Sequence, residues 1–558
     1  MKELKSGRGP GIRGCATENG FARLGLVLAA AAVALFVLWG GKHSYAGQEG
    51  STGSMAPPNN GQLHPASPQV KGGPHDGEWW RIPDDNTKLV VPEQDYIRFP
   101  LPPGEEKYAD VKGEDIKKIE LEVVAISEQS KADGNQLWGR IAGTKYDHMA
   151  AEWVQARFKK IGLEVHQEQQ NLPPRWMATS WQASVAMNGK TTPLTSAMPI
   201  PNSAGTTKGA LEVEPVWVGE GYASDFEGRD LHGKAALIYS WPTPGGQDST
   251  MIWNGALKRS KDAGAALVVM ILGFPGNGTN FPPVTPPADV PSIVISYDEG
   301  TALRQAMEAG LHPKIKLNLN VEIQSGLKTE TTWGVLPGAT DEKIIFLAHH
   351  DAYFDGAMDN ASGMALLQYI AARYAAMPKS QRRRTMVFMD TPLHHVETLK
   401  SPPVGVGARW LLDNVDTLFP NTVMVVNCEH TAETQFDMFG AGIMSTNTVV
   451  AHPFFVDGSE AYKKLVMDSF REFGVAVYRV REPSPGGELG ATQFYAKFPS
   501  FHVINREFYH TTLDTADWTP AAGMEEVARA YLKILDGTNQ MSRSDIWGNF
   551  KSRVNSGN

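Results

Sequence analysis

Four stretches of the chain bring together imidazole and carboxylate side chains, the pair of groups that binds zinc-like ions. They are His349-His350-Asp351 (with Asp359 shortly after), His394-His395, Cys428-Glu429-His430 and His510. Six of the 15 histidines fall in these stretches, so the histidines are concentrated rather than scattered. A divalent ion of this type takes three or four protein ligands and leaves a position for water. The residue types therefore predict a metal site, in which a bridging carboxylate would let two ions share one water.

Each of these stretches follows an apolar run that is typical of a buried strand. We expect strands over 343–348, 384–390, 422–427 and 498–505, and helices over 147–161, 362–374, 405–414, 459–473 and 521–537. This alternation predicts an α/β fold with a mostly parallel sheet and helices on both faces. Ligands of such sheets bind at the carboxyl ends of the strands, so we expect the four strand ends to meet at one site.

Residues 195–325 differ from the sequence on either side. Short strands alternate there with Pro/Gly loops, and the stretches GKAALIYSW, AGAALVVMIL and VPSIVIS resemble the protease-associated domain, a lid inserted into some exopeptidases. We expect a smaller, β-rich inserted domain without a catalytic cluster of its own. The catalytic domain would then consist of residues 114–194 and 326–558, and residues 47–113 would form a linker followed by a surface-wrapped segment.

Three motifs carry a resemblance to a known family. HHDAYFDGAMDNASG resembles the metal-binding core of the co-catalytic zinc exopeptidases, which include bacterial aminopeptidases and glutamate carboxypeptidase. WGRIAGTKYDHMAAEWVQARFKKIGLEV is similar to the N-terminal helix of that family, and FYHTTLDT to its final histidine motif. Together with the insertion, the similarity spans about residues 114–540. The resemblance implies the zinc-peptidase fold and a site for zinc or another divalent transition ion.

The resemblance also implies a role for individual residues. His349 would bind the first ion, Asp359 would bridge both ions, Glu429 would complete the first ligand set, and His510 would bind the second ion. Glu429 stands where the family has Asp, a longer arm of the same chemistry. Asp351 would orient the His349 ring from outside the ligand set. Arg506 and Tyr509 are placed by position alone in the substrate pocket.

The chain departs from the family at His394-His395, which stand where the family has two glutamates. His395 can still bind an ion, since neutral imidazole is a good zinc donor. His394 can still accept a proton near neutral pH, and is our candidate catalytic base, with Glu397 as the alternative. Replacing two carboxylates by imidazoles removes two negative charges beside two dications. The site is therefore expected to hold one or two ions, the second more weakly.

Two classes of function follow from the same scaffold. The first is a metal-dependent exopeptidase, acting on the amino or the carboxyl end of a peptide, in which a metal-bound water attacks the scissile carbonyl and His394 passes the proton to the leaving amine. The second is a catalytically impaired, receptor-like binding protein. A single-zinc acyl-transfer enzyme of the glutaminyl-cyclase type is a third possibility. No G-x-S-x-G motif occurs, which disfavours a serine hydrolase.

Composition and the N-terminal sequence restrict the binding partners and the cellular location that we expect. The net charge of −9 gives no basic excess for nucleic acid, and the oligomeric state stays open. Residues 24–39 form an apolar run after a basic segment, so residues 1–46 read as a signal peptide cleaved after Ala46 into an exported, periplasmic or secreted chain. If uncleaved, the run would anchor the chain to a membrane. Cys428 then remains as a lone, buried cysteine rather than a nucleophile.

Overall fold

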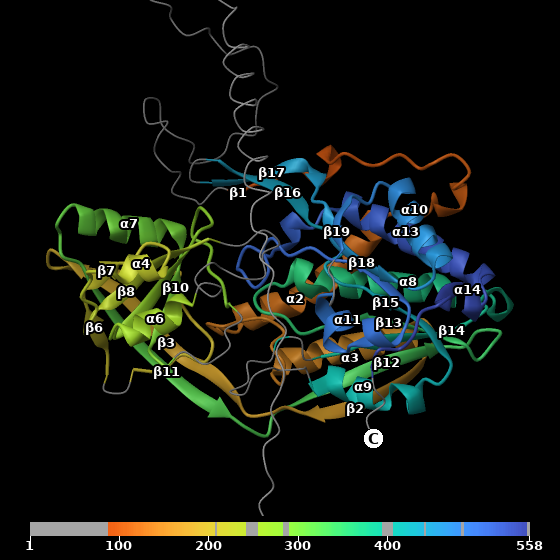
Figure 1. Cartoon of the computed structure of the whole chain (residues 1–558), viewed down its shortest axis with the longest axis horizontal. Coiled ribbons are helices and arrows are strands. Elements are labelled where there is room, and N and C mark those ends of the chain that lie inside the picture. The colour runs from red at the N-terminus through yellow and green to blue at the C-terminus, as the bar shows by residue number, and fades with distance from the viewer. Residues whose placement is uncertain are drawn as a thin grey trace, which may run out of the picture. The chain divides into compact units, whose positions relative to one another are not determined.

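The structure is a computed structural model (Figure 1). It describes residues 88–206, 209–241, 255–282, 289–392, 395, 406–439, 442–480 and 485–554. The predicted signal segment 1–46, His394 and Glu397 lie outside these residues. Across the described residues, no helix is both long enough and apolar enough to span a bilayer.

The largest sheet has eight strands in the order β19-β18-β20-β15-β13-β14-β12-β2. Their bounds are β2 Glu164–Asn171, β12 Lys328–Leu336, β13 Lys343–Ala348, β14 Thr385–Asp390, β15 Thr422–Asn427, β18 His452–Asp457, β19 Val477–Val480 and β20 Ser500–Val503. The central strands β14, β13, β15 and β20 are parallel to one another. β12 pairs antiparallel with β14 and with β2, and β18 pairs antiparallel with β20. The predicted parallel sheet is thus confirmed at its centre and becomes mixed toward its edges.

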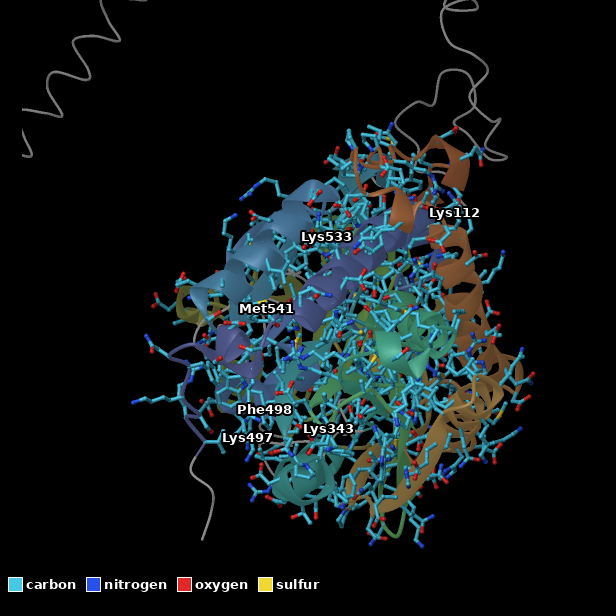
Figure 2. All side chains as sticks on the ribbon, turned by 90° about the vertical axis from the view of Figure 1, so that its right-hand side faces the viewer. Lys112, Lys343, Lys497, Phe498, Lys533 and Met541 are labelled. Atoms are coloured by element: carbon cyan, nitrogen blue, oxygen red, sulfur yellow. The ribbon has the colours of Figure 1, made fainter. Side chains whose placement is uncertain are left out.

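Both faces of this sheet are covered by helices, as predicted. Along β13, Ile344, Phe346 and Ala348 pack into one hydrophobic core, whereas Ile345 and Leu347 pack into a second, because successive side chains of a strand point to opposite faces. The first core is completed by α2 (Gly113–Ala132), α3 (Lys145–Lys160), α8 (Gly363–Ala375), α10 (Glu460–Glu472) and α13 (Ala521–Gln540). The second is completed by α9 (Val406–Leu418), α11 (Gly487–Ala491) and α12 (Phe494–Lys497). Figure 2 shows α13, which carries the labelled Lys533, between α10 and α2.

Two smaller sheets are built from residues 175–324. A five-stranded sheet has the order β5-β10-β9-β8-β7, with β5 Met198–Pro199, β7 Pro215–Trp217, β8 Ala235–Ser240, β9 Leu267–Leu272 and β10 Ser292–Ile295. α4 (Ala223–Phe226), α6 (Ala256–Asp262) and α7 (Tyr297–Glu308) are grouped around it in Figure 1. A four-stranded sheet has the order β4-β3-β11-β6, with β3 Arg175–Met187, β4 Lys190–Pro193, β6 Leu211–Val213 and β11 Lys314–Gln324.

A third small sheet ties the start of the described chain to a hairpin. β1 (Lys88–Leu89) pairs with β17 (Gly442–Val449), which pairs with β16 (Thr434–Phe439). Further along, Tyr96 and Tyr108 are buried, and Arg98 forms an ion pair with Glu525 of α13. The short helix α14 (Arg543–Trp547) follows α13. Residues 88–112 are therefore packed onto the rest of the chain by specific contacts.

Candidate metal centre

The sheet topology brings four strand ends to one place. His349 and Asp351 follow β13, His395 follows β14, Glu429 follows β15, and His510 lies seven residues beyond the end of β20. These four strands are parallel neighbours, so their carboxyl ends face the same edge of the sheet. All five side chains are buried. The structure therefore brings together the residues that the sequence placed at the metal site.

The Asp359 carboxylate lies at the middle of this cluster. It is carried by the helical segment η3 (Ala357–Ser362), directly before α8. Its Oδ1 lies 3.3 Å from His349 Nε2 and 2.9 Å from His430 Nε2, and its Oδ2 lies 3.3 Å from His395 Nε2 and 3.5 Å from His510 Nε2. Four imidazoles thus converge on the two oxygens of one carboxylate. This is the arrangement expected of a bridging ligand.

Neighbouring groups fix the orientation of Asp359 and of the two histidines that follow β13 and β14. The Asp514 carboxylate accepts the main-chain N–H groups of Met358 (2.7 Å) and Asp359 (3.1 Å). His349 Nδ1 lies 3.0 Å from the Asp351 carbonyl oxygen, which leaves its Nε2 facing Asp359. The Asp351 carboxylate also accepts the main-chain N–H of His395 at 2.9 Å. Asp351 therefore contacts the ring of His349 and the main chain of His395, which fits an orienting role.

His510 and His430 both have left-handed backbone, and each ring has a neighbour that orients it. His510 has φ 56°, and its Nε2 lies 2.7 Å from His395 Nδ1. His430 has φ 47°, and its Nδ1 hydrogen-bonds the carbonyl of Asn505. That bond directs His430 Nε2 toward Asp359, as the outer hydrogen bond of a metal-binding histidine does.

Two glutamates lie on the His349 side of the cluster. Glu429 Oε2 accepts hydrogen bonds from Asn427 Nδ2 (2.6 Å) and from the main-chain N–H of Glu488 (3.1 Å). Its Oε1 is buried, has no hydrogen-bond partner among the described residues, and lies 3.8 Å from His430 Nε2. Glu488 is buried as well, with its Oε2 3.9 Å from His349 Nε2.

The donor set fits a zinc-type ion. Ligand atoms of His349, Asp359 and His395 lie within 4.8 Å of one another, and so do those of His349, Glu429 and His430. Both groups mix imidazole nitrogen with carboxylate oxygen, the donors that zinc prefers. The buried, unsatisfied Oε1 of Glu429 is an atom that a cation would satisfy. Since the two groups share His349, the cluster is large enough for one ion or two adjacent ions.

The electrostatics of the cluster are dominated by its carboxylates. Burial alone would lower the pKa of His349, but the Glu488, Asp351 and Asp359 carboxylates raise it well above the usual value. Burial opposes ionisation of Asp359, yet the His395 and His430 rings hold its pKa well below the usual range. Burial, with the Asp359 charge beside it, raises the pKa of Asp514 to about 7. The site therefore favours positive charge at its centre.

The two residues predicted for the substrate pocket lie in the loop that carries His510. Tyr509 stacks on the His510 ring, with centroids 3.7 Å apart, and burial raises its pKa well above the usual value. Arg506 is buried in the same loop, three residues earlier.

His350 is not part of the metal cluster. Both ring nitrogens of His350 are engaged by carboxylates, Asp390 at 2.6 Å and Asp147 at 2.7 Å. His350 therefore belongs to a separate buried network.

Sequence reasoning missed His430 and Glu488. His430 stood in the predicted stretch after β15, but the family resemblance implied a ligand role there for Glu429 alone. The left-handed backbone at His430 lets both side chains reach the site. Glu488 carries one usable signal, an acidic residue inside the Gly-rich segment PGGELG between two predicted elements.

Comparison with known proteins supports the class that the site defines. Residues 332–391, which include His349 and Asp359, match the model of Peptidase family M28. The chain is 27% identical to aminopeptidase YwaD of Bacillus subtilis over 322 residues, or 53% of this chain and 64% of the relative. It is 25% identical to a probable glutamate carboxypeptidase VP8 of Zea mays over 209 residues, or 35% of this chain and 28% of the relative. The chain thus covers less than two thirds of either relative.

Solved structures share the fold. A zinc aminopeptidase from Bacillus subtilis superposes with a TM-score of 0.53 at 17% identity, covering 79% of this chain and 99% of that one. A peptidase M28 precursor from Shewanella amazonensis gives 0.57 at 16% identity, covering 79% and 98%. At these identities the likeness establishes the fold alone. With the family match it confirms the resemblance to the co-catalytic zinc exopeptidases and supports a zinc-dependent metallopeptidase.

Proposed function

We propose that the chain is a metal-dependent exopeptidase that hydrolyses peptide bonds. The observation that carries this proposal is the Asp359 carboxylate, which is contacted by the rings of His349, His395, His430 and His510. A carboxylate shared by imidazoles from several strand ends is suited to hold two cations close together. Zinc bound there would polarise the scissile carbonyl and acidify the attacking water.

The ligands divide into two sets that share Asp359. His349, Glu429 and His430 lie on one side and would hold the first ion. His395 and His510, whose ring nitrogens approach to 2.7 Å, lie on the other and would hold the second. The first set contains an additional carboxylate and the second only imidazoles. We therefore expect the first ion to bind more tightly.

Residues around the ligands would bind and orient the substrate. Asp351 keeps the His349 ring turned toward Asp359 through its carbonyl and holds the His395 main chain through its carboxylate. The Tyr509 hydroxyl stays protonated because burial raises its pKa, so it can donate a hydrogen bond to a carbonyl oxygen. The Arg506 guanidinium would add positive charge to the pocket. His394 remains our proposed carrier of the proton to the leaving amine, with Glu397 as the alternative.

The first experiment counts metal per chain. We expect about two equivalents of zinc in the purified chain by mass spectrometry, and about one in a His395→Ala variant. His232→Ala is the matched control, since the His232 side chain is 85% exposed and lies in a separate surface pair with Asp230. No bound metal in the wild-type chain, even after zinc is added, would refute the proposal.

The second experiment identifies the reaction. The zinc-loaded chain is given an aminoacyl p-nitroanilide, its N-acetylated form and an N-acyl dipeptide with a free carboxylate. Cleavage of the first compound alone identifies an aminopeptidase, and cleavage of the third a carboxypeptidase. A chain that binds two ions but cleaves none of the three compounds would instead support the receptor-like function.

Two further parts of the proposal rest on sequence. The apolar run 24–39 and the small residues around Ala46 support export, with anchoring by the uncleaved run as the alternative. The stretches within 195–325 support a protease-associated domain inserted between the two halves of the catalytic domain. Both are testable by sequencing the N-terminus of the mature chain and by limited proteolysis near residues 195 and 325.

A further inference from the structure

A carboxylate outside the predicted ligand set faces the metal centre. Glu488 lies on α11, between β19 and β20 along the chain, and only 2% of the residue is exposed. Its Oε2 lies 3.9 Å from Nε2 of His349, the nitrogen that points at Asp359. The side chain therefore approaches the ion side of His349 rather than its back.

A main-chain hydrogen bond links Glu488 to Glu429, a second residue of the metal site. The main-chain N–H of Glu488 donates to Glu429 Oε2 at 3.1 Å. The preceding Gly487 has φ 63°, and a Cβ at that position would run into the Glu429 carboxylate. The Gly486-Gly487 pair thus lets α11 begin directly against Glu429. This close approach places the Glu488 side chain beside the Glu429 carboxylate and the His349 ring.

The distances are those of donors that share one ion. Two ligands of a tetrahedral zinc, each about 2.1 Å from it, have donor atoms about 3.4 Å apart. His349 Nε2 lies 3.3 Å from Asp359 Oδ1, and the Glu429–His430 pair is separated by 3.8 Å. The 3.9 Å between Glu488 and His349 falls beside these values, so a small side-chain rotation would bring Glu488 into the ligand set.

The burial of the Glu488 carboxylate gives an independent reason to expect a cation beside it. A buried carboxylate is costly unless a cation or several donors stabilise it, and Glu488 is buried close to the carboxylates of Asp351 and Glu429.

We propose that Glu488 is an additional carboxylate ligand of the ion that His349 holds. This inference rests on the proposed function, because it requires the centre to bind metal. The first ion would then be held by His349, by His430 and by carboxylates from three separate elements, Asp359, Glu429 and Glu488. The second ion would keep only Asp359, His395 and His510.

The test measures zinc affinity in the full chain, by competition with a chromophoric chelator, for wild type, Glu488→Gln and Glu120→Gln. Glu120 is a matched control, because it is a fully buried glutamate paired with Lys117 on α2, outside the centre. We expect Glu488→Gln to weaken the tighter of two zinc ions at least tenfold and to reduce the zinc-induced rise in Tm. Glu120→Gln is expected to bind both ions like wild type. Cobalt-loaded samples should show a changed visible spectrum only in Glu488→Gln.

The outcomes separate this inference from the proposed function. If wild type binds two ions and Glu488→Gln binds both with unchanged affinity and spectrum, the ligand role is wrong and the exopeptidase proposal stands. If wild type binds no zinc, both are wrong. If near-UV circular dichroism shows that Glu488→Gln does not fold, Glu488→Asp decides, since the shortened arm should weaken the tighter ion at least threefold. Wild-type affinity in that variant would overturn the ligand role.

Discussion

The main-chain N–H of Phe281 donates a 2.9 Å hydrogen bond to the carbonyl of His510, a proposed metal ligand. Thr279 adds two more bonds to the same loop, because its carbonyl accepts from Thr512 N–H at 2.8 Å and its N–H donates to Thr512 Oγ1 at 3.0 Å. The Phe281 ring packs against Tyr353, whose hydroxyl donates to the carbonyl of His395 at 3.0 Å. The segment between β9 and β10 thus contacts His510 directly and reaches His395 through Tyr353.

This contact predicts that Phe281→Ala weakens the second ion. The substitution removes the ring that packs on Tyr353 and loosens the strand-like pairing with the His510 loop. Leu303→Ala is the control, since Leu303 is buried on α7 in the same hydrophobic core, and both truncations should cost about 2 to 5 kcal/mol of stability. Zinc titration should show weaker binding of one ion in Phe281→Ala alone. Equal zinc affinities in the two variants would contradict the prediction.

His430→Gln tests the ligand that the sequence did not reveal. Glutamine removes the imidazole Nε2 that lies 2.9 Å from Asp359 Oδ1. We expect the affinity for the first ion to fall at least about tenfold, the effect of disturbing even outer partners of a metal ligand. His232→Gln is a suitable comparison, because His232 is exposed and pairs with Asp230 away from this cluster. A variant that titrates with zinc like wild type would exclude His430 from the ligand set.

Gly487→Ala should disturb Glu429 without altering any ligand. Both Gly487 and Gly310 have positive φ, 63° and 70°, so alanine costs about 1 kcal/mol of backbone strain at either position. A Cβ meets the Glu429 carboxylate at Gly487, whereas nothing lies within 4 Å of a Cβ at Gly310. Zinc affinity should therefore drop in Gly487→Ala and stay unchanged in Gly310→Ala. A drop in both variants would indicate a general loss of stability instead.

His452 should make the zinc-free chain less stable in acid. Burial on β18 lowers its pKa to about 4, below the usual value near 6.5. Between these pH values the unfolded chain binds a proton that the folded chain does not, so stability is lost as pH falls from about 6.5 to about 4, by about 3 kcal/mol in total. His452→Leu should flatten the pH dependence of urea unfolding in this window. Parallel curves for the two proteins would disprove the linkage.

The sequence predicted the centre of the fold better than its edges. Apolar runs ending in metal-type residues located β13 and β15 at their observed bounds. β12 and β18 were not predicted as strands, and their direction depends on how the chain crosses the sheet rather than on local pattern. The β16–β17 hairpin and its pairing with β1 were also not predicted, because pairing between distant segments leaves no local pattern.

The residues of the site also fall into two groups, those that the sequence revealed and those that it did not. His349, Asp359 and His510 could be found because each stands in a short motif next to a predicted strand. His430 required the local backbone to be left-handed, and Glu488 required the short helix α11 to pack near the end of β13. Neither feature leaves a periodic signal in the sequence.

The spread of the proposed ligands along the chain has a consequence for biosynthesis. His349 leaves the ribosome long before His510, and β20, which carries the His510 loop, must join β15 before the last ligand is in place. A nascent chain therefore cannot assemble the complete centre, and the segment around Phe281 waits unpaired until residues 510–512 emerge. The proposed peptidase activity would therefore be absent until synthesis of the chain is almost complete.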